Sequence, residues 1–232
     1  MKRITYLLAV LLLLIGSMPS MADELTAQEI FEGMIYYEND QLESNTDYTD
    51  YHCRVVQTKE TTGVRATESL EKDLYFMVPA YQLHMIGGTP AYYFDSDAII
   101  ITLESLDMER LRDATINDVD CYVIRGTPKD PAFARFNTTY YVAKDDFRHV
   151  RTVKLGSNDE YDSTTTVLDY TYGPEGPCNM VQNIVATTST PDGNVIYTVN
   201  AVYSDYEYNI GLDVEFFLSA FEGEGQPNPI WN

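Results

Sequence analysis

Histidines, paired carboxylates and tyrosines are the side chains of this sequence that could carry chemistry. The three histidines, His52, His84 and His149, lie far apart, and no His-x-x-x-His or His-Glu-x-x-His motif occurs, so a zinc enzyme is not predicted. The chain contains neither a Gly-x-Ser-x-Gly nucleophile elbow nor a phosphate-binding loop. The sequence therefore gives no positive indication of catalysis, and we expect a protein that is not an enzyme.

Paired carboxylates occur at Asp95 and Asp97 and again at Asp118 and Asp120. Residues two apart share one face of a β-strand, so each pair could hold a cation. Aspartate is also a common turn residue, and turns place acids in the same pattern. We interpret both pairs as turn residues and predict neither a metal site nor a cofactor.

Tyrosine is the residue type in excess, with 19 copies in the chain. Many tyrosines alternate with apolar residues, which gives a strand face that is apolar along the ring and polar at the hydroxyl. A wide apolar surface with few charged groups suits acyl chains better than sugars or ions. An ordinary tyrosine-rich β core would have the same composition, so both interpretations stay open at this point.

The formal net charge of −21 restricts the possible partners. Such a surface repels the phosphates of nucleic acids and disfavours docking onto anionic lipid headgroups. We therefore exclude nucleic-acid binding. The charge fits a solvated acidic surface that keeps an exported protein soluble, and it could also steer the protein toward a basic protein partner.

The first 22 residues have the pattern of an export signal. Lys2 and Arg3 precede an apolar run over residues 7–16, which is too short to span a bilayer comfortably, and Ser20-Met-Ala22 fits a cleavage site. We expect cleavage after Ala22, no stable membrane anchor, because no lipid-attachment cysteine follows, and a periplasmic location. The remaining 210 residues suit one domain over residues 23–221 and a flexible, Gly- and Pro-rich tail over residues 222–232.

Three cysteines remain after cleavage, namely Cys53, Cys121 and Cys178. An exported location permits a disulfide. Their odd number and wide spacing allow one bridge and one buried thiol, but they do not define the pairing.

The stretch from Asp120 to Asp169 alternates β-branched and aromatic residues between turn signals, which indicates an antiparallel meander. Thr26-Ala-Gln-Glu29 is a capping box that opens an amphipathic helix to about Gln41, and a short helix is predicted over Ser105–Asp113. We predict a mainly β fold, an open antiparallel half-barrel of about ten strands, with both helices over its concave face. The N-terminal helix could be core packing or a lid over a cavity.

The order of several segments resembles that of the LolA/LolB-like outer-membrane lipoprotein-sorting superfamily. In the meander these segments are Cys121–Pro131, Thr139–Asp146 and Val150–Val153. The exported leader followed by a helix that begins at Thr26–Ile30, and the closing segment Tyr208–Phe216, are similar too. The resemblance covers nearly the whole mature chain.

This resemblance implies a half-barrel whose helices plug its mouth and whose cavity holds lipid acyl chains. The classical carriers have an arginine before the proline that ends the second long strand, and it ties down the lid. Val78 precedes Pro79 here, so the classical handover mechanism lacks that group. The residues that we expect to line the cavity are Ile30, Met34, Tyr51, Val55, Leu74, Phe76, Leu83, Met85, Tyr122, Ile124, Tyr140, Val142, Leu168 and Tyr170.

The leading functional hypothesis is a periplasmic carrier that takes acyl chains of lipids or lipoproteins for outer-membrane lipoprotein sorting. Its partners would include a membrane lipoprotein-releasing transporter or another envelope protein. The alternative on the same fold is a sensor or regulator that binds a lipoprotein or a membrane signalling protein. An enzyme or a purely structural envelope module is a further alternative.

Overall fold

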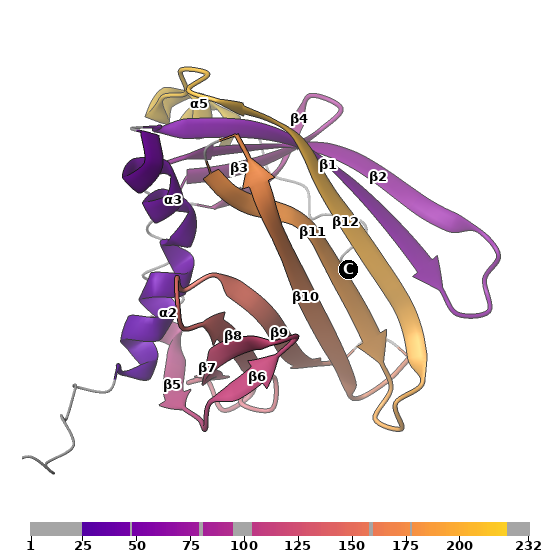
Figure 1. Cartoon of the computed structure of the whole chain (residues 1–232). Coiled ribbons are helices and arrows are strands. Elements are labelled where there is room, and N and C mark those ends of the chain that lie inside the picture. The colour runs from indigo at the N-terminus through magenta and orange to yellow at the C-terminus, as the bar shows by residue number, and fades with distance from the viewer. Residues whose placement is uncertain are drawn as a thin grey trace, which may run out of the picture.

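Antiparallel strands make up most of the chain in this computed structural model (Figure 1). The structure describes residues 25–46, 48–78, 81–94, 104–157, 160–176 and 178–221. The predicted export signal with its cleavage site at Ala22, the predicted tail over residues 222–232, and the Asp95 and Asp97 pair lie outside these residues. Helices are α2 (Ala27–Ile35), α3 (Tyr37–Thr46) and α5 (Val214–Phe221). Strands are β1 (Asp50–Thr61), β2 (Thr67–Met77), β3 (Tyr81–Ile86), β4 (Thr89–Phe94), β5 (Leu106–Arg110), β6 (Ala114–Ile116), β7 (Val119–Pro128), β8 (Thr138–Ala143), β9 (His149–Gly156), β10 (Thr164–Glu175), β11 (Cys178–Ser189) and β12 (Val195–Tyr208).

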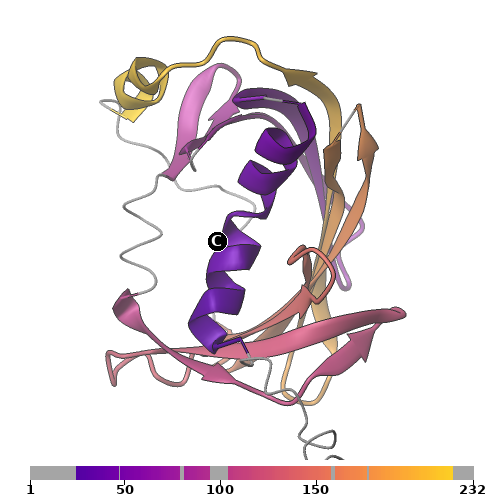
Figure 2. The ribbon, with the colours of Figure 1, turned by 60° about the vertical axis from the view of Figure 1, so that its left-hand side comes forward.

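The strands form one 12-stranded antiparallel sheet in the order β4-β3-β2-β1-β12-β11-β10-β9-β8-β7-β5, with β6 also paired to β7. β1 pairs with β12, so the two ends of the strand sequence meet in the middle of the sheet. The sheet does not close, and it curves into the predicted open half-barrel (Figures 1 and 2).

Cross-strand register defines which side chains share the concave face. Leu74 of β2 lies directly opposite His84 of β3, and Tyr140 of β8 lies opposite both Ile124 of β7 and Thr152 of β9. Directly opposed residues of antiparallel strands point to the same side of a sheet. The alternate residues of these strands therefore look into the curve.

Helices α2 and α3 follow one another inside the curve of the sheet (Figure 2). The predicted capping box is confirmed: the Glu29 backbone N–H donates to Thr26 Oγ1 at 3.2 Å, and the Thr26 backbone N–H donates to Glu29 Oε2 at 2.8 Å. The predicted single helix to Gln41 is interrupted at Tyr36 and continues to Thr46. Helix α2 contacts β5 and β7, while α3 contacts β11, so the pair bridges separate parts of the half-barrel.

Helix α5, which the sequence did not predict, covers β3 and β4. Phe217 is fully buried there against Leu83 and Met77. No helix in the described part of the chain is long and apolar enough to cross a membrane.

The short inserted helix predicted over Ser105–Asp113 is wrong. Residues Leu106–Arg110 form the edge strand β5, which pairs with β7. Leu106 and Met108 are both apolar and two residues apart, so this short segment is compatible with the two-residue period of a strand as well as with a helix. Pairing to β7 decides the outcome: Met108 lies opposite Gly126, where the absent side chain leaves room for both apolar residues.

Candidate functional site

A cavity of about 350 Å³ lies between the two inner helices and the concave face of the sheet. Ligand sites in proteins commonly enclose about 300–1,000 Å³, so this volume suits a single chain or a small group. The helices contribute Met34, Ile35, Tyr37 and Glu38 to its wall, and the sheet contributes Leu74, Phe76, Gln82, His84, His149, Tyr170, Tyr172, Val181, Ile184 and Tyr203.

Aromatic rings build one side of this cavity. His149 stacks on Tyr170 with ring centroids 4.1 Å apart, and Tyr37 meets Tyr172 edge to face at 5.4 Å. The Tyr37 hydroxyl donates to the backbone oxygen of Asn179 at 3.0 Å, which ties the start of α3 to β11. The rings thus present apolar faces to the cavity, and the Tyr37 hydroxyl is engaged with the protein.

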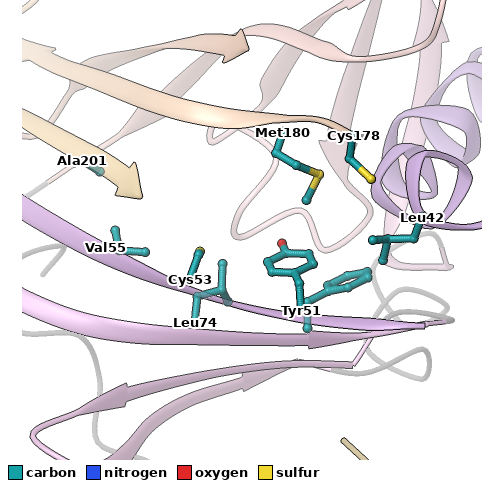
Figure 3. Close-up of a cluster of buried hydrophobic side chains, with 9 residues drawn as sticks. Leu42, Tyr51, Cys53, Val55, Leu74, Cys178, Met180 and Ala201 are labelled. Atoms are coloured by element: carbon teal, nitrogen blue, oxygen red, sulfur yellow. The ribbon is translucent and has the colours of Figure 1, made fainter. Parts of the chain in front are cut away.

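A buried cluster beside the cavity anchors α3 to the sheet (Figure 3). Leu42 of α3 packs there with Tyr51 and Cys53 of β1 and with Met180 of β11. Each of these side chains is at most 1% exposed. Because burial of a large apolar side chain contributes about 1.5–3 kcal/mol, this cluster stabilises the packing of α3 on the sheet.

Glu38 is the carboxylate of the cavity wall. The Tyr51 hydroxyl donates to Glu38 Oε2 at 3.1 Å. Among the described residues, no lysine or arginine forms an ion pair with Glu38. Burial raises the pKa of Glu38 to about 7, and the hydrogen bond from Tyr51 opposes part of that rise.

Both histidines of the cavity wall are neutral at pH 7. Burial lowers the pKa of His84 to about 3, with nearby Lys72 as the second cause. Burial likewise lowers the pKa of His149 to about 3, with Lys154 as the second cause. The cavity wall therefore combines neutral imidazoles with apolar and aromatic groups.

Most of the predicted lining residues lie on the concave side, in four groups. Met34, Leu74, Phe76 and Tyr170 line the cavity itself. Tyr51 and Val55 belong to the cluster under α3, and Leu168 packs with Ala186 and Val199 farther along the sheet. The group under α2 consists of Ile30, Tyr122, Ile124, Tyr140 and Val142. Contact with a lipid remains a prediction for all of them.

The predicted face of β3 is corrected by the structure. Gln82 and His84 line the cavity, whereas Leu83 and Met85 lie on the other face and pack in the cluster of Phe217 from α5. The apolar side chains of β3 lie on the face of the sheet that α5 covers. A one-residue change of phase moves every side chain of a strand to the opposite face.

Sequence reasoning missed the polar residues of the wall, Glu38, Gln82, His84 and His149. The alternation in β3 carried a usable signal, because His84 must face away from Leu83. Of the Asp118 and Asp120 pair, only Asp118 is a turn residue, with a φ of 65° before β7, whereas Asp120 lies in β7 opposite Thr115. All three cysteines are free and buried, so the possible bridge is absent.

Comparisons with known proteins bear on the fold. No protein-family model matches the chain, and no curated protein matches its sequence. A DUF1329 family protein from Desulfovibrio piger superposes with a TM-score of 0.53 at 12% identity, covering 81% of this chain and 96% of that chain. A LolA superfamily protein from Nitrosomonas europaea gives 0.50 at 13% identity, covering 84% and 98%. The chain therefore has the open half-barrel fold of these proteins, as the resemblance implied.

Proposed function

We propose that this protein is a non-enzymatic periplasmic carrier that binds an acyl chain of a lipid or lipoprotein for outer-membrane lipoprotein sorting. In this proposal the chain is exported and loses residues 1–22. The observation that carries it is the cavity between α2, α3 and the concave face, walled by apolar and aromatic side chains. Each methylene group moved from water into such a site contributes about 0.8 kcal/mol.

The inner helices provide a means of release. Helix α3 is held by the Leu42 cluster and by the Tyr37 bond to Asn179, while α2 rests on a separate cluster. Movement of this pair would open the cavity along its length. Val78, which replaces the arginine of the classical carriers, packs against the α3 cluster and adds no ion pair to the closed state.

Filling the cavity tests the proposal. Ile184 lines it, and Val185, the next residue of β11, points to the opposite face. Ile184→Trp should weaken binding of dodecanol at least tenfold by occupying the space of the chain, whereas Val185→Trp should bind like the wild type. Isothermal titration calorimetry measures both, and thermal melting verifies that each variant is folded.

The cargo can be identified by native mass spectrometry of the protein purified from the periplasm without detergent. A bound mass in the range of a phospholipid or lipopeptide is the expected result. A mass of the protein alone, together with no uptake of dodecanol, would overturn the carrier and favour a sensor that binds a protein partner.

A further inference from the structure

Lys72 of β2 is a largely buried side chain on the concave face, and its ammonium nitrogen keeps contact with solvent. Only 5% of its surface is exposed, and it lies directly opposite Val55 and two residues from Leu74 of the cavity wall. No residue in the described part of the chain forms a hydrogen bond or an ion pair with this ammonium. Burial lowers the pKa of Lys72 to about 8, so the group remains mostly charged at neutral pH.

The ammonium lies beside the cavity. Leu74, two residues along β2 on the same face, lies directly opposite His84 of the cavity wall, so Lys72 stands next to this part of the wall along the strand. Lys154 of β9, on the other arm of the sheet, shares the concave face with Thr152, and its side chain is exposed. Lys72 is therefore the cation that strand register places nearest the cavity wall.

The carboxylate of Glu38 lies at a different point of the cavity wall. Glu38 is bonded to Tyr51, and Tyr51 lies directly opposite Phe76 of β2. Lys72 is four residues from Phe76, which corresponds to about 13 Å along an extended strand. A bound amphiphile would therefore meet a carboxyl group beside α3 and an ammonium group farther along β2.

We propose that the ligand is a single-chain amphiphile with an anionic end, a carboxylate in the first instance, which pairs with Lys72 while its chain lies in the cavity. This inference rests on the proposed function, because it orients the same bound chain. A largely buried ammonium group has lost part of its hydration, and pairing it with an anion through a charge-assisted hydrogen bond offsets part of that loss. The cavity volume of about 350 Å³ fits one chain better than the several chains of a whole lipid.

The experiment compares three ligands with the same chain and different ends: dodecanoate, dodecanol and dodecyltrimethylammonium. Each is titrated below its micelle concentration into the wild type at pH 7. We expect dodecanoate to bind at least tenfold more tightly than dodecyltrimethylammonium, although the net charge of −21 favours the cation. Equal or reversed affinities would overturn the role of Lys72. Dodecyl phosphate, as a fourth ligand, distinguishes a phosphate end from a carboxylate end.

Lys72→Met removes the charge at similar volume, and exposed Lys129→Met removes the same charge elsewhere. Lys72→Met should bind dodecanoate about tenfold more weakly than the wild type and dodecanol with unchanged affinity. The unchanged dodecanol affinity would show that the cavity of the variant is intact. Lys129→Met should behave like the wild type. If Lys72→Met binds dodecanoate as the wild type does, the inference fails while the carrier stands. If the wild type binds none of the ligands, the proposed function itself fails.

Discussion

Burial sets the charge state of the titratable side chains around the cavity. The imidazoles of His84 and His149 stay neutral because their pKa values are lowered to about 3, and Glu38 is close to half ionised at pH 7 because its pKa is raised to about 7. These shifts have consequences for stability, since the same groups titrate near their ordinary values in the unfolded chain. Glu38 gives the cleaner test, because glutamine has nearly its shape and keeps an oxygen for Tyr51.

Glu38→Gln should stabilise the protein above pH 7 by up to about 3 kcal/mol. A carboxyl whose pKa is higher in the folded state favours folding fully below pH 4.5, and this contribution is lost as the pH rises through 7. The difference between variant and wild type should therefore be small at pH 4 and largest at pH 8. Urea unfolding at several pH values measures it, and the exposed Glu43→Gln on the same helix is the control. A pH-independent difference would contradict the burial of Glu38.

At the scale of elements, α2 depends on a glycine for its close approach to the sheet. A Cβ atom at Gly33 would lie 2.7 Å from Cδ1 and 2.9 Å from Cγ of the Phe147 ring. Phe147 packs in the cluster under α2 and stands at a positive φ of 64°, so its backbone is already in an unfavourable region. The contact leaves little freedom for either partner to move.

Gly33→Ala should therefore destabilise the protein by about 1–3 kcal/mol, although alanine is the better helix former. The reason is steric, so the effect should depend on Phe147. In a double-mutant cycle with Phe147→Ala, the combined cost should be smaller than the sum of the single costs by at least about 0.5 kcal/mol. Denaturant unfolding of the four proteins gives this coupling, and additive costs would show that α2 does not dock as described.

For several strands, the alternation of apolar and polar residues within the strand was enough to predict which side chains face the concave side. Leu74 and Phe76 on β2, and Tyr140 and Val142 on β8, all point inward. The face of β3 could not be predicted in the same way, because its apolar side is covered by α5, a helix about 130 residues later in the chain. The place of Glu38 in the cavity wall could not be predicted from its own helix either, since its hydrogen-bond partner Tyr51 lies on β1.

At the scale of the whole molecule, the pairing of β1 with β12 joins two arms of one sheet, and α2 with α3 bridges between them (Figure 1). The bridge rests on two separate hydrophobic clusters, one under each helix. Several ion pairs, such as Arg54 with Glu71 at 2.7 Å, link neighbouring strands at partly exposed positions. Exposed ion pairs contribute about 0–1 kcal/mol each, so the hydrophobic clusters dominate the stability of this arrangement.

Because acidic residues outnumber basic ones, we expect added salt to stabilise this protein against unfolding. Thirty-six acids face fifteen lysines and arginines, and the resulting self-repulsion opposes the compact state. Raising NaCl from 0.01 to 0.3 M shortens the screening length from about 30 Å to below about 8 Å, which weakens that repulsion more than it weakens short ion pairs. We expect the melting temperature to rise by about 2–4 °C, the change that corresponds to about 1 kcal/mol in a chain of this size. Differential scanning calorimetry measures the shift, with sucrose at equal osmolality as the uncharged control. A melting temperature that falls with NaCl would mean instead that surface ion pairs, rather than the apolar clusters, hold the half-barrel in its curved form.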